Sequence, residues 1–306
     1  MTTTQDSGAE DLQATWLEDR GIIALSGEDA RGFLQGVVSN DVSKVTPTRA
    51  LWAAFLTPQG KYLHDFFLLE KNGSLLIETE AARLPDLLRR LKLYKLRSKV
   101  VLEDQSERWR VAAVWGDGAA ERFGLDETAG QAAELGEGLA FVDPRQAGLG
   151  LRLLVGAEKL PDDLAPAPRA AWDARRIALG LPDGSRDMEI EKALLLENGF
   201  DELGGVDWKK GCYMGQELTA RTKYRGLVKK RLLPIASRDG RPLAGTKILQ
   251  AGKEVGELRS QVEGQGLALL RLQALATGEP LTLEGREVEV RPPDWVVLPQ
   301  AKAAAS

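Results

Sequence analysis

The chain has 306 residues, of which 43% are hydrophobic and 28% are charged, and its formal net charge is −4. This length allows about two domains, and the composition is typical of soluble globular proteins. No stretch approaches roughly 18 consecutive apolar residues, which argues against a transmembrane helix, and a single cysteine excludes an internal disulfide.

The first half of the chain is typical of an α+β unit. Apolar residues from Leu84 to Tyr94 follow helical spacing, and Asn72-Gly73 predicts a hairpin because both residues tolerate positive φ. In chain order we expect a strand at 21–26, a helix at 27–35, strands at 51–57 and 62–70 joined by a turn at 58–60, strands near 99–103 and 109–115, and a helix with loose connections at 116–138.

The second half changes character near Lys229. Before it, we expect strands within 139–155, a proline-containing connector at 161–168, a helix at 169–179 and an irregular stretch at 180–208. After it, short alternating strands separated by glycine turns predict a small β-barrel or sandwich. We therefore predict a body over 1–228, an all-β domain over 229–300 and a disordered tail at 301–306.

The N-terminus predicts no secretory signal, because it has no basic residue before Arg20 and no apolar core. One cysteine suits a reducing compartment, and we expect a soluble, cytoplasmic protein that does not bind membranes. The single histidine, His64, argues against a conventional zinc site, and we expect no stably bound metal.

Positive charge is concentrated in two segments. Residues 209–231 hold eight Lys/Arg against one acid, and residues 83–99 hold seven against one. Basic segments on an acidic chain favour a defined anionic partner. A solvated helix face explains 83–99 equally well. Nucleic acid is a less favoured partner, to be detected by binding that weakens steeply with salt.

The cysteine lies in the block Lys209-Lys210-Gly211-Cys212-Tyr213-Met214-Gly215-Gln216-Glu217. A helix is expected to open at Gln216, which would place Cys212 beside a helix N-terminus, with lysines close by, and favour its thiolate. The alternative is a buried structural thiol, since free cysteine is among the most buried residue types.

The segment KGCYMGQELTART around Cys212 resembles the signature of the YgfZ family of folate-binding proteins, and most of all the branch that contains mitochondrial iron-sulfur maturation factors. That family is related to the T-protein of the glycine cleavage system, an aminomethyltransferase. The resemblance extends over roughly residues 16–298 and includes further matching runs, LSGEDA at 25–30, FLQGVVSNDV at 33–42, TPQGK at 57–61, KYRG at 223–226 and KKR at 229–231.

This resemblance implies an α+β, T-protein-like aminomethyltransferase fold, in which ferredoxin-like units form two subdomains and a C-terminal small β-barrel completes a ring around a folate pocket. It implies tetrahydrofolate, with a polyglutamate tail, as cofactor. The folate-binding residues implied for this chain are Trp172, Lys95, Arg97, Lys210, Tyr213, Gln216 and Arg225. Plain core packing is the alternative for Trp172.

The chain departs from the T-protein at two positions. Where that enzyme has adjacent aspartates, this chain reads His64-Asp65, and its Arg-Leu-Glu-Ala-Gly run is matched by residues 176–180, with Ala178 in place of the glutamate. An alanine cannot accept a hydrogen bond from a pterin. Both changes argue against aminomethyl transfer.

We therefore expect an accessory factor that assists assembly or repair of [4Fe-4S] clusters in client enzymes, among them tRNA-modifying radical-SAM enzymes. Its chemistry would depend on Cys212 as a transient cluster ligand, with iron-sulfur assembly proteins as partners. Ordinary catalytic turnover is not expected. The alternatives are a folate-dependent one-carbon transferase using Asp65 or Cys212, and an RNA-binding module.

Overall fold

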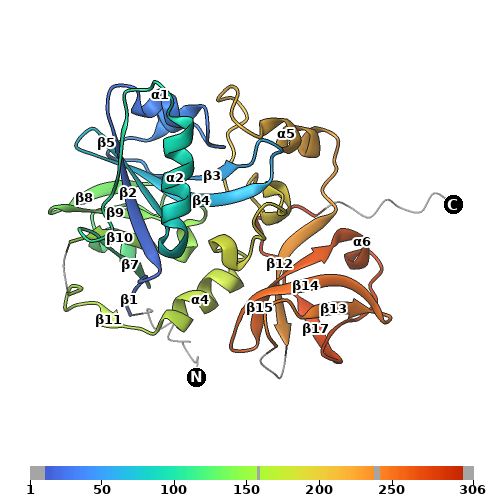
Figure 1. Ribbon diagram of the computed structural model, residues 1–306. Helices are drawn as coiled ribbons and strands as arrows, with labels where there is room; N and C mark the ends of the chain where they lie inside the picture. The colour runs from blue at the N-terminus through green and yellow to red at the C-terminus, as the bar shows by residue number, and fades with distance from the viewer. Residues whose placement is uncertain (1–10, 157–158, 238–241, 299–306) are drawn as a thin grey trace, which may run out of the picture.

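The computed structural model describes residues 11–156, 159–237 and 242–298, which form two sheets and a closed barrel (Figure 1). The barrel, orange to red in Figure 1, packs against helix α4 (Arg169–Ala178). The α+β fold class with a C-terminal barrel is confirmed. The predicted tail at 301–306 lies outside the described residues.

The first sheet has the strand order β3-β4-β5-β2-β6, and every neighbouring pair is antiparallel. Successive side chains face opposite sides, so Phe66 enters one core and Phe67 another. The Asn72-Gly73 hairpin is confirmed, with φ of 51° and 76° at the two residues. The strands are β2 (Arg20–Ser26), β3 (Leu51–Leu56), β4 (Tyr62–Lys71), β5 (Ser74–Glu80) and β6 (Val101–Asp104).

Two helices cover one face of this sheet. Leu87 and Leu91 of α2 (Leu84–Tyr94) lie in the same core as Phe33 and Leu34 of α1 (Ala30–Gln35). The helical spacing read from the sequence therefore identifies α2 correctly, and its buried face except for Tyr94, which is 40% exposed. Short 3₁₀ helices accompany them, η1 (Val42–Lys44) and η2 (Ala81–Arg83).

The second sheet has the order β11-β1-β7-β10-β9-β8 and shares a large core with the first. That core joins Trp52 and Phe67 of the first sheet to Trp115 and Phe141 of the second and to Trp172 of α4. The elements of this half are β1 (Gln13–Trp16), β7 (Arg110–Trp115), α3 (Ala119–Arg122), β8 (Ala132–Leu135), β9 (Gly138–Val142), η3 (Ala147–Leu149), β10 (Leu151–Val155) and β11 (Ala165–Pro166).

The expectation of a helix across 116–138 is wrong, because only α3 is helical there and β8 is a strand. Glycines at 118, 124, 130 and 136 all have positive φ, which interrupts a right-handed helix. The helix expected from residue 27 begins at Ala30, since Gly27 has φ of 111° and its backbone lies against the Lys99 carbonyl.

The barrel closes in the order β12-β15-β14-β13-β16-β17 and is fixed to the body by specific contacts. Trp295 donates its indole N–H to the Leu179 carbonyl at 2.8 Å, and Arg231 donates to the Leu196 carbonyl at 2.8 Å. Its elements are β12 (Lys230–Ser237), β13 (Lys247–Gln250), β14 (Lys253–Val262), β15 (Gln265–Arg271), α6 (Leu272–Leu275), β16 (Leu281–Leu283) and β17 (Arg286–Val290). The exact domain boundary stays a prediction.

A buried ion-pair network crosses the centre of the body. Glu78 on β5 accepts hydrogen bonds from Arg20 at 3.0 Å and from Arg152 on β10 at 2.5 Å. Asp143 accepts from Arg152 at 3.1 Å and from Arg145 at 2.8 Å. Burial alone would raise the pKa of Asp143, but the adjacent Arg145 and Arg152 guanidinium groups lower it.

The network continues through α4 to the barrel. Arg176 donates to Asp173 at 2.7 Å, to Asp187 at 2.8 Å and to the Ser260 hydroxyl of β14 at 3.0 Å. Arg20 lies 3.9 Å from Asp183, which connects the two parts. Both sheets, α4 and the barrel therefore share one set of buried charges.

The stretch at 180–208, expected to be irregular, contains the 3₁₀ helices η4 (Gly184–Arg186) and η5 (Leu195–Asn198), and α5 (Gln216–Tyr224) follows it. No helix in the described ranges has the length and apolar character needed to cross a membrane.

Candidate functional site

Cys212 is exposed, in the loop that precedes α5. The expectation that a helix opens at Gln216 is confirmed, with Gly215 as its N-cap at φ of 80°. The buried-thiol alternative is wrong, because the cysteine side chain is not covered.

Two glycines hold this loop against the hairpin between β3 and β4. A Cβ atom on Gly215 would lie 2.6 Å from the Thr57 carbonyl and 2.9 Å from the Gly60 Cα atom, and one on Gly60 would lie 2.6 Å from the Gly215 carbonyl. Both glycines also have positive φ, near 80°. The loop therefore approaches the hairpin backbone to backbone, which only glycine allows at these two positions.

The loop is also fastened to the chain that follows α1. The Met214 N–H donates to the Gly36 carbonyl at 3.1 Å, and Gln35 donates to the Lys210 carbonyl at 3.4 Å. The Lys210 ammonium donates to the carbonyls of Val38 at 2.5 Å and Asn40 at 2.7 Å. Three segments quoted in the resemblance, 33–42, 57–61 and 210–222, thus meet around Cys212.

Lys210 anchors the Cys212 loop through its ammonium group. Its ammonium lies 5.1 Å from the centre of the Tyr213 ring and is half-buried, and burial lowers the pKa of Lys210 to about 8. Tyr213 is itself buried, which raises the pKa of its phenol to about 12. Sequence reasoning missed these anchors because their partners lie about 170 residues away, as with Val38 at a separation of 172.

The C-terminal end of α5 has a Schellman-type cap. The Leu227 N–H donates to the Thr222 carbonyl at 2.9 Å, and the Gly226 N–H donates to the Lys223 carbonyl at 3.1 Å, with Gly226 at φ of 59°. Arg225, predicted to bind a folate tail, is exposed at this end, as are the neighbouring Tyr224 and Leu227.

Asp65 lies inside the body and both of its carboxylate oxygens are bonded. Oδ2 accepts from the Trp52 indole at 2.9 Å, and Oδ1 accepts from the Tyr62 hydroxyl at 2.8 Å. Burial and the neighbouring Asp65 carboxylate raise the pKa of Tyr62. The adjacent His64 lies in a different setting, where its Nε2 is 3.0 Å from Asp86.

Trp172 is only 1% exposed and belongs to the shared core, so its packing agrees with the core alternative. Its ring centre lies 5.6 Å from that of Trp115 and 5.9 Å from the Arg152 guanidinium. Arg152 of the buried ion-pair network therefore lies against the Trp172 ring.

The predicted folate-binding residues are not gathered at one place. Lys95, at the C-cap of α2, donates to the Val100 carbonyl at 2.6 Å, and the nearby Arg97 is exposed. Lys210, Tyr213 and Gln216 belong to the loop of Cys212. Trp172 and Asp65 are in the core, and Arg225 is at the end of α5. Their binding roles stay predictions, without support from this arrangement.

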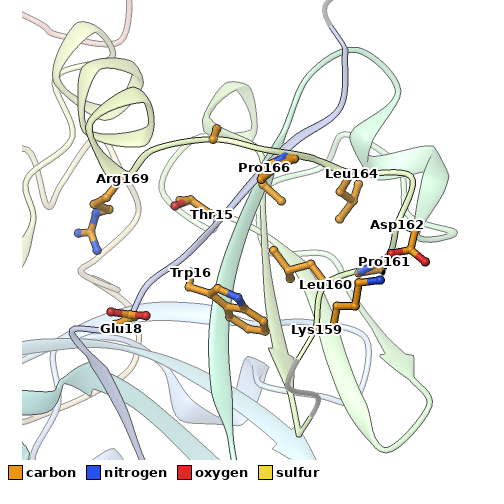
Figure 2. Close-up of a pocket in the computed structure, with 12 residues that line it drawn as sticks. Thr15, Trp16, Glu18, Lys159, Leu160, Pro161, Asp162, Leu164, Pro166 and Arg169 are labelled. Carbon is orange, nitrogen blue, oxygen red and sulfur yellow. Dashed lines mark ion pairs between the residues drawn. The ribbon is translucent and has the colours of Figure 1, made fainter.

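Among the hollows elsewhere on the described surface, two have helix residues in their walls, Arg169 of α4 in one and Phe33 of α1 in the other. Figure 2 shows one of about 610 Å³, where the side chains of Trp16, Leu160 and Pro161 face one another and Arg169 and Glu18 lie across from them. The other, of about 980 Å³, is formed by α1 and the turn after α2 and includes Arg97. The walls of these two hollows include neither Cys212, Asp65 nor Trp172.

Within the described ranges, no group of three or more His, Cys, Asp or Glu side chains is arranged to hold a metal ion. A single exposed thiol cannot retain a cluster without ligands from another molecule.

Comparison with known proteins gives a consistent family likeness. A protein-family profile described as "CAF17, C-terminal beta-barrel domain" matches residues 229–298. The iron-sulfur cluster assembly factor IBA57 homolog, mitochondrial, of Coccidioides immitis is 32% identical, over 90% of this chain and 74% of that protein. The mitochondrial iron-sulfur cluster assembly factor IBA57 of Homo sapiens is 35% identical, over 91% of this chain and 84% of that protein.

Among solved structures, the glycine cleavage system aminomethyltransferase T from Bartonella henselae has a TM-score of 0.76 over 94% of this chain and 87% of that one, at 14% identity. This likeness confirms the predicted T-protein fold. The cytoplasmic prediction is wrong, because these curated relatives are mitochondrial proteins. One cysteine and an unremarkable N-terminus do not distinguish one reducing compartment from another.

Proposed function

This chain belongs to the IBA57 family of iron-sulfur cluster assembly factors, and from that premise we propose that it assists assembly or repair of [4Fe-4S] clusters in client enzymes. The observation that carries the proposal is the exposed Cys212 thiol on a loop held in place by Gly60, Gly215 and Lys210. A thiol fixed in this way can meet a cluster on another protein without a change in the fold.

In this proposal Cys212 supplies one thiolate to a cluster that is cargo, and a partner supplies the remaining ligands. Iron-sulfur assembly proteins and the client enzymes are the expected partners, with tRNA-modifying radical-SAM enzymes among the clients. The exposed position of Cys212 allows its sulfur to make direct contact with a cluster on another protein.

The first test is Cys212→Ala in cells that depend on this protein. Because the side chain is exposed, we expect an unchanged thermal midpoint, and because the thiol is the proposed ligand, we expect client activity to fall to the level of a strain without the protein. Enzymatic activity of a [4Fe-4S] client in cell extracts is the measurement.

Glu217→Gln is the matched control, since Glu217 is an exposed neighbour in the first turn of α5 and its loss keeps the thiol. It should keep client activity within about twofold, because exposed ion pairs contribute little. Normal client activity in the Cys212→Ala strain would remove the thiol from the mechanism.

Tetrahydrofolate binding stays a prediction and is kept apart from the proposed thiol chemistry, since Trp172 is buried in the shared core and both oxygens of Asp65 already accept hydrogen bonds. Calorimetric titration of tetrahydrofolate into the protein is the measurement, and the absence of saturable heat would contradict the prediction. Saturable binding that disappears in a folded Trp172→Phe variant would support it and would place a pterin against that ring.

A one-carbon transferase is not favoured. Such an enzyme would need a carboxylate free to handle the reacting carbon, whereas both oxygens of Asp65 accept hydrogen bonds from Trp52 and Tyr62.

A further inference from the structure

The end of α2 and the turn after it expose apolar side chains. Leu96 is 86% exposed, Leu93 is 64% exposed and Val101 is 51% exposed. We call this the Leu96 surface, defined by Leu93, Tyr94, Leu96 and Val101 with the neighbouring cations Lys92 and Arg97. Contiguous exposed apolar side chains with a polar rim are typical of a binding site for another protein.

The turn that exposes Leu96 has a conformation that is fixed by hydrogen bonds of the neighbouring Lys95. Leu96 has φ of 45°, a left-handed conformation that non-glycine residues rarely adopt. The flanking Lys95 holds it, because its backbone N–H donates to the Leu91 carbonyl at 3.0 Å and its ammonium donates to the Val100 carbonyl at 2.6 Å. A large apolar side chain is thus held outward where glycine would be the unstrained choice.

A hollow of about 980 Å³ lies beside Leu96. Its wall is formed by the turn after α2 and by the N-terminal half of α1, and its members are Glu28, Asp29, Gly32, Phe33, Leu96, Arg97 and Ser98. A hollow next to protruding apolar side chains gives a partner both a ridge to cover and a recess to fill.

The cations at this end of α2 and in the turn after it outnumber the acids of the hollow, which are Glu28 and Asp29. The segment 83–99 carries seven Lys/Arg against Asp86 alone. Lys92 and Arg97 are exposed, and neither forms an ion pair with any residue in the described ranges, whereas Lys99 pairs with Glu28 at 2.8 Å. The complementary partner therefore presents carboxylates around an apolar centre.

This surface lies close to the loop of Cys212 because both contact α1. Gly32 and Phe33 line the hollow, while Gln35 and Gly36 hydrogen-bond to the loop. Six helical residues extend about 9 Å. A protein bound at the Leu96 surface is therefore within reach of the thiol.

We propose that the Leu96 surface docks the protein that shares an iron-sulfur cluster with Cys212, and that this protein binds through an acidic patch with exposed apolar side chains. The inference rests on the proposed function of Cys212 and adds the place and chemistry of the partner. Docking here leaves the thiol free to approach the cluster.

The test is photo-crosslinking in cells with p-benzoylphenylalanine in place of Leu96, followed by mass spectrometry of the adduct. We expect an adduct with an iron-sulfur assembly protein or client, joined through a peptide rich in Asp and Glu. Lys92→Glu with Arg97→Glu should reduce its yield about tenfold, since rim charges govern association. Cys212→Ser should keep it.

The same crosslinker in place of Leu243, which is 78% exposed on the barrel, is the matched control, and Lys253→Glu is the control for charge reversal. No adduct at position 96, adducts with lipid or nucleic acid, or a yield that charge reversal leaves unchanged would each overturn the proposal. An adduct kept by a Cys212→Ser strain with normal client activity would support docking and reject the role of the thiol.

Discussion

At the residue scale, burial sets the properties of the single histidine and of the lysine beside the cysteine. His64 is 2% exposed, and burial together with the nearby Arg83 guanidinium lowers the pKa of its imidazole to about 4, against the opposing effect of Asp86. Lys210 loses basicity through burial in the same way. Neither pKa shift could be predicted from the sequence, because the sequence does not show how far the side chains of His64 and Lys210 are buried.

The protonation of His64 gives a prediction for stability in acid. The unfolded chain binds a proton at His64 near pH 6.5 and the folded chain only near pH 4, so stability from this group is complete above 6.5 and is lost as pH falls toward 4. The full loss is about 3 kcal/mol.

Urea unfolding at pH 7.5 and pH 4.5 is the measurement, with NMR of the one imidazole to locate its pKa. His64→Gln should reduce the difference between the two pH values, while other titrating groups affect both proteins equally. An imidazole that titrates at its ordinary value in the folded protein would exclude this account.

At the element scale, local sequence patterns predict individual helices, hairpins and strands but not the contacts between them. The leucine spacing of α2, the Asn72-Gly73 hairpin and the glycine-separated barrel strands follow from local preferences, so they could be predicted. The meeting of Gly60 with Gly215 joins residues 155 positions apart and has no local signal. The sequence motifs around Cys212 can be recognised from their residues alone, whereas the contacts between them are seen only in the folded structure.

Gly215→Ala should destabilise the protein by more than Gly211→Ala. Both glycines have positive φ, which costs a residue with a Cβ about 1–2 kcal/mol, but a Cβ at 215 also meets the Thr57 carbonyl at 2.6 Å, while at 211 it meets nothing within 4 Å. Unfolding free energies from urea titrations measure the difference. Equal losses in the two variants would mean that the hairpin contact does not hold the loop.

At the scale of the whole molecule, body and barrel are held together by apolar packing of Ile177 on Leu232 and Leu267 and by specific polar contacts. Trp295 reaches back from the end of the barrel, and a Cβ atom on Gly199 would lie 2.8 Å from its ring. Arg176 links α4 to Ser260 of the barrel. The change in strand spacing near Lys229 predicts that a barrel follows, but the contacts of the barrel with the body depend on residues spread over the whole chain.

Trp295→Ala should weaken the contact between the barrel and the body. It removes the packing on Gly199 and the hydrogen bond to Leu179, for a loss of about 2–3 kcal/mol in a half-buried tryptophan. Calorimetry should then show the barrel melting before the body. Val297→Ala, at a side chain that is 72% exposed, is the control and should stay within about 0.5 kcal/mol of the parent. One unchanged transition in Trp295→Ala would show that other contacts suffice.

The reach of Trp295 across the molecule also sets an order of events on the ribosome. Arg176 and Gly199 are synthesised before their barrel-side partners Ser260 and Trp295, by an interval of roughly ten seconds at ordinary elongation rates. During that interval the Arg176 guanidinium lacks the Ser260 hydroxyl, and Gly199 is not yet covered by the Trp295 ring. The segment that carries Trp295 therefore covers Gly199 late, and a chain released before it would present that uncovered surface to chaperones and proteases.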